Sequence, residues 1–173
     1  MNEQQYTATM KRRYLLLFLI TFLTGFNNTF VSAGDEDEIR SILQMKTAPE
    51  GVVFEVLAAK DGLTWAIPRI KQFSDQLRQR FPELPIAVVS HGREQFALQT
   101  VHAPEYASVH NQVQSLVSDD AVRVHVCGTY AEWKGVSPEE FPDYVDVAAE
   151  GPAQIRSYQE LGYIKVIIAK PGK

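Results

Sequence analysis

The strongest constraint on the fold is the alternation of short valine- and isoleucine-rich runs with longer stretches of helical periodicity. The runs that are typical of strands lie at residues 51–58, 85–92, 121–127 and 163–169, with a shorter one at 144–148. Nearly continuous apolar runs of this length are typical of parallel strands that are covered on both faces. The alternation therefore predicts a single α/β domain with a mostly parallel sheet and helices on both of its faces.

Helices are predicted between these strands. The longest is predicted to start at Thr64 as its cap and to end before Pro82, with Pro68 tolerated in its first turn. Its apolar residues recur at helical spacing and predict a buried face. The other predicted helices, or helix starts, cover residues 93–98, 106–117, 129–133, 137–140 and 151–161. Gly162 is predicted to end the last of them.

The first 33 residues have the layout of a secretory signal peptide. A positive segment at residues 11–13 precedes an apolar core at 14–23, and Val31-Ser32-Ala33 is a small-residue cleavage signal. An uncleaved membrane anchor is the competing interpretation, but two asparagines interrupt the apolar stretch, which is short for a span. We therefore expect cleavage, a periplasmic or secreted mature protein, and no membrane contact after cleavage.

Residues 34–50 form an acidic segment ahead of the predicted domain, which covers residues 51–173. The run Asp35-Glu36-Asp37-Glu38 opens this segment. A run of like charges beside a chain end is most simply solvated and mobile. The prediction is therefore a mobile acidic start, one or two short helical turns at residues 39–45, and then one folded domain.

The sequence also argues against several classes of function. It contains no Gly-rich dinucleotide fingerprint, no phosphate-binding loop and no Cys-x-x-Cys pair. Its four histidines are scattered without metal-ligand spacing. The formal net charge is −4 and no basic patch stands out, so nucleic acid is not an expected partner. We expect neither a cofactor nor a metal.

Cys127, the sole cysteine, ends a β-branched run and is followed by Gly128. A thiol at the carboxyl end of a strand, beside a helix N-terminus, is well placed to react as a thiolate. Ligands of open α/β sheets bind at that end of the strands. Cysteine is also among the most buried residue types, so an inert core thiol is the open alternative. A single cysteine in an oxidising compartment forms no internal disulfide, which leaves an intermolecular, buried or reactive thiol.

His91 ends another predicted strand and is the candidate partner of Cys127. If the two strands are neighbours, both residues lie at one edge of the sheet, where a histidine supports a thiolate or carries a proton. The alternative is a turn residue that hydrogen-bonds to the backbone. His125 shares a strand face with Cys127 and is interpreted as a satisfied core residue. Tyr130 and Trp133 are candidates for an apolar lid over the thiol, or for packing or subunit contacts.

Six different short motifs follow one another along the chain in a definite order. They lie at residues 88–92, 126–128, 135–140, 145–147, 151–155 and 161–163. Together they resemble the DsrE/DsrF-like family of small sulfur-handling proteins, and the resemblance covers roughly residues 51–170. It implies a three-layer α/β/α domain that assembles into trimers or hexamers. It also implies that Cys127 carries sulfur as a persulfide.

The two strand ends and the resemblance together give a set of predicted site residues. Cys127 is the nucleophile and His91 the second catalytic residue. The predicted substrate contacts are Gly92, Gly128, Thr129 and Tyr130. Gly128 is expected to let a donor approach, and the backbone N–H groups from Gly128 to Tyr130 to stabilise an anion. The well-understood sulfur-relay members are cytoplasmic, whereas this chain carries an export signal, so its donor and acceptor are left open.

Three hypotheses for the function follow. The first is a periplasmic sulfur-binding or sulfur-transfer protein that uses Cys127, with protein or small-thiol sulfur donors and acceptors as partners. The second is a non-catalytic α/β module that binds a small ligand or a protein at the edge of the sheet, with Cys127 inert. The third is a structural oligomer in which Cys127 lies at a subunit interface.

Overall fold

The computed structural model describes residues 34–170, and the predicted signal peptide at residues 1–33 lies outside the described residues. Five strands form one sheet in the order β4-β3-β2-β1-β5, and every neighbouring pair is parallel. The strands are β1 (Gly51–Val56), β2 (Ile86–Ser90), β3 (Arg123–Cys127), β4 (Asp146–Ala148) and β5 (Tyr163–Ile167). The prediction of an α/β domain built on a parallel sheet is confirmed.

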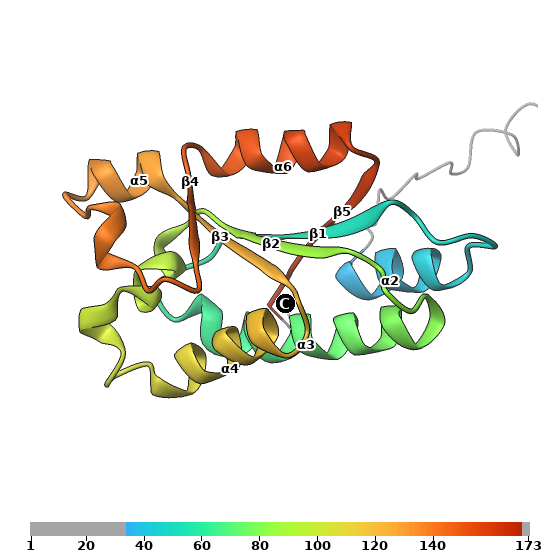
Figure 1. Ribbon diagram of the computed structural model, residues 1–173, viewed down its shortest axis with the longest axis horizontal. Coiled ribbons are helices and arrows are strands. Elements are labelled where there is room, and N and C mark those ends of the chain that lie inside the picture. Colours follow the sequence, from blue (N-terminus) through green and yellow to red (C-terminus); the bar gives the residue numbers. More distant parts are fainter. Residues whose placement is uncertain (1–33, 171–173) are drawn as a thin grey trace, which may run out of the picture. The chain divides into compact units, whose positions relative to one another are not determined.

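Helices cover both faces of the sheet (Figure 1). One face carries α2 (Asp35–Leu43), α3 (Gly62–Arg80) and α4 (Ala107–Ser118), and the other carries α6 (Gly151–Glu160). Strands β1 to β4 follow one another across the sheet, and β5 then returns to the edge beside β1. Because parallel crossovers are right-handed, reversing the direction of travel moves the connecting helix to the opposite face. This is why α6 lies on the face opposite to α3 and α4.

The remaining helices are short and lie around the carboxyl ends of the central strands. The helix α5 (Gly128–Trp133) follows β3 directly. Three 3₁₀ segments complete the list: η1 (Arg93–Leu98), η2 (Thr100–His102) and η3 (Pro138–Glu140). The predicted helix start at Ser137 is real, with a capping box to Glu140, but the helix lasts a single turn. None of the helices within residues 34–170 is both long and apolar enough to cross a membrane.

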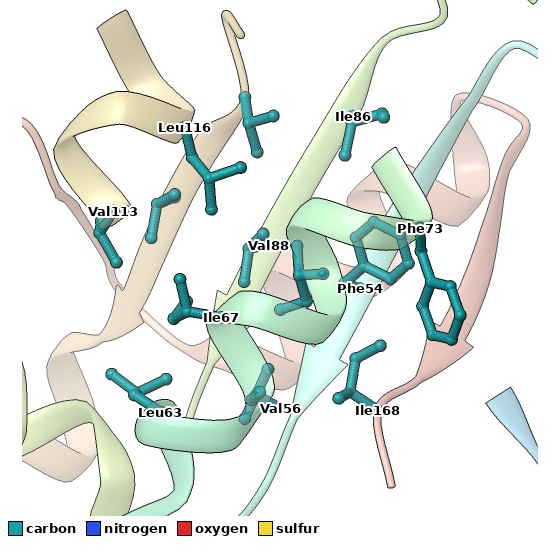
Figure 2. Packing of buried hydrophobic residues seen from close by; sticks show 14 of the residues in the cluster. Phe54, Val56, Leu63, Ile67, Phe73, Ile86, Val88, Val113, Leu116 and Ile168 are labelled. Carbon is teal, nitrogen blue, oxygen red and sulfur yellow. The ribbon is translucent and has the colours of Figure 1, made fainter. Parts of the chain in front are cut away.

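The main hydrophobic core lies between the sheet and the α3–α4 layer, where alternate strand residues meet the apolar faces of both helices (Figure 2). Its strand residues include Phe54, Val56, Ile86 and Val88, and its helix residues include Leu63, Ile67, Val113 and Leu116. The opposite face has a far smaller cluster, formed by Val53, Ala87, Val89, Ile155 and Tyr158. The α6 face therefore has room for polar side chains, and the candidate site occupies it.

The helix α3 begins earlier than predicted. It starts at Gly62, so Thr64 lies in its first turn, donating its hydroxyl to the Asp61 carbonyl oxygen at 2.7 Å, and Pro68 lies in the second turn. A β-carbon at Gly62 would lie 2.4 Å from that of Ala58. Close packing of this kind depends on tertiary contacts, which is why local propensity placed the N-cap at Thr64, three residues after the observed cap at Asp61.

The acidic segment is not a mobile start, in contrast to the prediction. It forms α2, whose Ile39 and Ile42 belong to the main core. Asp35 is buried and pairs in a bidentate manner with Arg69 of α3, at 2.6 and 2.8 Å, and also accepts the backbone N–H of Ala169. The charge run misled the prediction because, of its four acidic residues, Asp35 is buried and Glu38 is half-buried.

Candidate functional site

A cavity of about 340 Å³ lies beside Cys127, at the carboxyl end of β3. Its walls come from the ends of β2 and β3, from α5 and from the start of α6. The lining residues are His91, Cys127, Thr129, Tyr130, Trp133, Glu150 and Pro152. We call this space the Cys127 cavity. It brings the predicted nucleophile and the predicted histidine to one site.

The register of the sheet explains why His91 and Cys127 meet. Ser90, the last residue of β2, pairs with Val126 of β3. The residues that follow them, His91 and Cys127, therefore lie side by side at the same edge of the sheet. A β-carbon built on Gly151 would lie 2.5 Å from the His91 β-carbon and 3.3 Å from that of Cys127. The first residue of α6 therefore sits against both side chains, and any larger residue at this position would collide with them.

The backbone of Cys127 is fixed by one buried side chain. Gln95 of η1 accepts the Cys127 N–H at 2.9 Å and donates to the Cys127 carbonyl oxygen at 3.2 Å. Gln95 is fully buried, so both hydrogen bonds are shielded from water. Hydrogen bonds to both backbone groups of one residue leave the peptide little freedom, and they set the point from which the thiol projects.

The turn that carries His91 is fixed by the neighbouring buried residue, Glu94. Its carboxylate accepts the Ser90 hydroxyl and the Gly92 N–H at 2.9 Å each, and the Ala58 N–H at 2.7 Å. These three donors come from the ends of two adjacent strands. Glu94 is fully buried, and its hydrogen bonds tie the exit of β1 to the exit of β2, which holds His91 over the sheet.

A row of charged and polar side chains runs across the α6 face toward the cavity. Glu55 of β1 lies between Lys165 of β5 and His91. The Lys165 Nζ is 2.8 Å from Glu55 Oε2, and the His91 Nε2 is 2.9 Å from Glu55 Oε1. Burial raises the pKa of Glu55, but the hydrogen bonds and charges of Lys165 and His91 outweigh burial and hold it below its ordinary value. Glu55 is therefore a carboxylate at neutral pH.

His125 lies on the same strand face but has a separate set of partners. Its Nε2 is 2.8 Å from the Tyr158 hydroxyl, and its Nδ1 is 3.8 Å from Asp146 Oδ2. Burial lowers the pKa of His125 against the opposing pull of Asp146, so the ring is neutral at neutral pH. It packs under α6 as the sequence interpretation expected of a satisfied core histidine.

No protein-family model matches the chain, and no curated protein matches it by sequence. Several solved structures do match its fold. MTH1491 of Methanobacterium thermoautotrophicum, a protein of unknown function, superposes with a TM-score of 0.53 at 19% identity, over 67% of this chain and 96% of that one. The ychN protein of E. coli superposes with a TM-score of 0.50 at 14% identity, over 68% and 97%. The fold is DsrE/DsrF-like.

In this DsrE/DsrF-like fold the predicted substrate contacts separate into two groups. Thr129 and Tyr130 line the Cys127 cavity. Gly92 does not: a β-carbon there would lie 2.3 Å from Glu94 Oε2 and 2.8 Å from the Ala58 nitrogen, so this glycine serves backbone packing.

Gly128 faces a second, larger cavity of about 650 Å³ between α5 and β4, which Thr129 also lines. A β-carbon on Gly128 would lie 2.9 Å from the Ala148 carbonyl oxygen. The Thr129 N–H and hydroxyl both donate to the Ala149 carbonyl oxygen, at 2.9 and 2.8 Å. The expectation that every N–H from Gly128 to Tyr130 is available to an anion is therefore wrong for Thr129.

The helix α6 supplies the electrostatic setting that sequence reasoning assigned to α5 alone. It is ten residues long and begins at Gly151, against Cys127 and His91. The N-terminus of a helix carries partial positive charge, which stabilises an anion placed beside it. The start of α6 therefore favours an anionic ligand in the cavity.

Sequence reasoning missed Glu55, Glu94, Gln95 and Gly151. Glu55 had a signal, because it is the one charged residue in the apolar run at 51–58. Glu94 and Gln95 had none, since polar residues after a strand are usually solvated. Within residues 34–170, no cluster of three or more histidine, cysteine or acidic side chains is placed to hold a metal ion.

Proposed function

We propose that this protein is an exported sulfur carrier that binds sulfane sulfur as a persulfide on Cys127 in the periplasm or outside the cell. The observation that supports the proposal most directly is the Cys127 cavity. It combines the sole thiol of the chain, an adjacent histidine and the N-terminus of a ten-residue helix on a DsrE/DsrF-like fold. Export rests on the signal-peptide pattern of residues 1–33.

The proposed chemistry is one thiol–persulfide exchange. The Cys127 thiolate attacks the outer sulfur of a donor persulfide, R–S–SH. A new S–S bond forms on Cys127, the donor S–S bond breaks, and the donor leaves as RS⁻ and takes up the proton that Cys127 gave up. The products are Cys127–S–SH and RSH, so no oxidant or reductant is needed. Transfer to an acceptor thiol is the same exchange in reverse.

The volume of the cavity, about 340 Å³, has room for a small persulfide donor. Cys127 is 5% exposed, so a donor has to enter the cavity to reach the sulfur. Tyr130 and Trp133 form an aromatic wall, with their rings 6.5 Å apart in an edge-to-face arrangement. Trp133 is 76% exposed and forms the outer part of that wall.

Homo-oligomerisation as a trimer or hexamer is part of the proposal and is checked by sedimentation.

The test is mass analysis of the mature protein after incubation with inorganic polysulfide and removal of the excess. The expected result is a gain of one sulfur atom, reversed by a thiol reductant, and no gain in the Cys127→Ser variant. Retention of near-wild-type melting in that variant controls for folding. Stoichiometric sulfur uptake by Cys127→Ser, or none by the wild type, contradicts the proposal. A thiol that reacts only after denaturation supports the non-catalytic binding module instead.

A further inference from the structure

We propose that Glu55, itself held by Lys165, is a positioning residue that orients His91 as the proton acceptor of Cys127. This inference rests on the proposed function and identifies how its site is set up. Glu55 touches neither the thiol nor the cavity. Its effect on Cys127 passes through His91, the only one of the three side chains that lines the Cys127 cavity.

The geometry assigns the two nitrogens of the imidazole ring. His91 Nε2 is 2.9 Å from Glu55 Oε1, and a carboxylate only accepts hydrogen bonds, so Nε2 carries the proton. In neutral His91 the other nitrogen, Nδ1, is then an acceptor. Among residues 34–170, the structure gives Nδ1 no hydrogen-bond partner, and the ring lines the cavity. Glu55 thereby selects the tautomer whose basic nitrogen is free to take a proton from a group in the cavity.

The ion pair with Lys165 explains how a carboxylate persists in this position. The Glu55 and His91 side chains are only 16% and 10% exposed, so an unpaired charge here would be costly. Lys165 approaches from the neighbouring strand at 2.8 Å and is itself 32% exposed. The ion pair with Lys165 keeps Glu55 ionised. Because Lys165 contacts Oε2, the other oxygen, Oε1, stays available to His91. Lys165 of β5, Glu55 of β1 and His91 just after β2 thus form a row that ends in the Cys127 cavity.

The proton balance of sulfur loading gives His91 a defined task. Cys127 has to lose a proton to attack, and the leaving RS⁻ gains one. A histidine beside the thiol takes the first proton and returns it to the leaving group within one exchange, so the net reaction consumes none. Other ionisable groups facing this step are Glu150 on the cavity wall, Tyr130 on α5 and the Lys165–Glu55 pair.

The experiment is a double-mutant cycle of Glu55→Gln and His91→Gln on the mature protein. Two rates are measured across pH: sulfur loading from inorganic polysulfide, and alkylation of Cys127 by iodoacetamide. Each single variant is expected to slow both rates by at least about a hundredfold, the lower end of what a positioned base contributes. The double variant is expected to be no slower than His91→Gln alone. We expect His91→Gln to remove one limb of the pH–rate profile, and we expect Glu55→Gln to remove the same limb.

A second cycle in a Lys165→Met background removes the cation that Glu55→Gln leaves unpaired, so that misfolding is not mistaken for lost positioning. Glu105→Gln is the matched control, because it removes one carboxylate and its exposed pair with Lys60, and neither residue lines the cavity. The inference is overturned if Glu55→Gln reacts like the wild type, or if the two effects multiply in the double variant. If the wild type takes up no sulfur but the alkylation rates follow the cycle, the proposed function fails and the positioning role stands.

Discussion

The peptide of Cys127 is held by a single side chain, that of Gln95. Replacing Gln95 by leucine keeps the volume but leaves the Cys127 N–H and carbonyl without their partner in a buried setting. An unsatisfied buried polar group costs about 1–3 kcal/mol, so we expect a loss of about 3 kcal/mol in the free energy of unfolding. Urea unfolding measures this loss.

Gln112→Leu is the matched control for that substitution. Gln112 lies on the exposed side of α4 and donates to Ser108 at 2.8 Å. A surface substitution of this kind changes stability by no more than about 0.5 kcal/mol. A Gln95→Leu variant as stable as the control would show that the two hydrogen bonds to Cys127 contribute nothing.

His125 makes a separate prediction, about pH. Burial lowers its pKa below the ordinary 6.5, so the unfolded chain binds a proton more readily than the folded one. Its contribution to stability is complete above that pH and is lost as the pH falls from 6.5 toward the folded value. The slope from one proton is at most about 1.4 kcal/mol per pH unit.

The His125→Gln variant tests this assignment, because glutamine can still bond to the Tyr158 hydroxyl but does not titrate. Unfolding free energies of both proteins at a series of pH values between 8 and 5, a span of about three units around the histidine range, give the comparison. We expect the wild type to lose more stability than the variant on acidification. Parallel curves would place the titrating group elsewhere.

At the scale of the element, α2 is attached to the domain by one buried ion pair as well as by Ile39 and Ile42. Asp35 is 5% exposed and pairs with Arg69 at 2.6 Å, whereas Glu36 is a second, exposed partner of Arg69 at 3.0 Å. Breaking a buried pair costs about 3–5 kcal/mol, and we expect about 2–3 kcal/mol for Asp35→Asn because Glu36 still neutralises Arg69. Thermal and urea unfolding provide the measurement.

The acidic run itself contains the control. Asp37 pairs with Arg40 on the solvent side of the same helix, where both side chains are at least half exposed. Exposed pairs of this kind contribute about 0–1 kcal/mol, so Asp37→Asn is expected to change stability little. Equal effects of the two substitutions would mean that Asp35 is not the attachment point of α2.

The same helix shows where sequence reasoning reaches its limit. Strands rich in valine and isoleucine were predictable, because burial on both faces selects those residues whatever the neighbours are. The helix α4 was predictable from the period of its apolar residues, and α6 from Gly151 and Pro152 at its start and Gly162 after its end. The helix α2 was not fully predictable, because the buried Asp35 carboxylate is satisfied by Arg69, which lies 34 residues further on, and by the backbone N–H of Ala169. A polar residue with a distant partner carries no local signal.

The candidate site divides along the same line. Cys127 and His91 end strands, and strand ends are visible in a sequence, so both were predicted and both line one cavity. Glu94 and Gln95 are fully buried polar residues whose partners come from other strands. Their role follows from the crossing of η1 beneath the strand ends, which no local pattern encodes. The residues that react are therefore easier to predict than those that hold them in place.

At the scale of the whole molecule, the described residues belong to one compact unit with one dominant core. That core joins α2 at the start of the unit to Ile168 near its end. A shared core of this kind predicts a single cooperative unfolding transition for the mature chain. Trp65 packs against the core while Trp133 is exposed, so a Trp133→Phe variant leaves Trp65 as the one fluorescent reporter of that core.

We expect the urea midpoint from Trp65 fluorescence to coincide with the midpoint from far-ultraviolet circular dichroism, which reports all helices together. The physical reason is that neither α2 nor α6 buries enough apolar surface to remain folded once the sheet is lost, and the sheet loses its cover without α3 and α4. A loss of helical signal that precedes the fluorescence change would identify an element that unfolds separately. In that case α6, with its small apolar cluster of Ile155 and Tyr158, is the element to test first, and the Cys127 cavity would open with it.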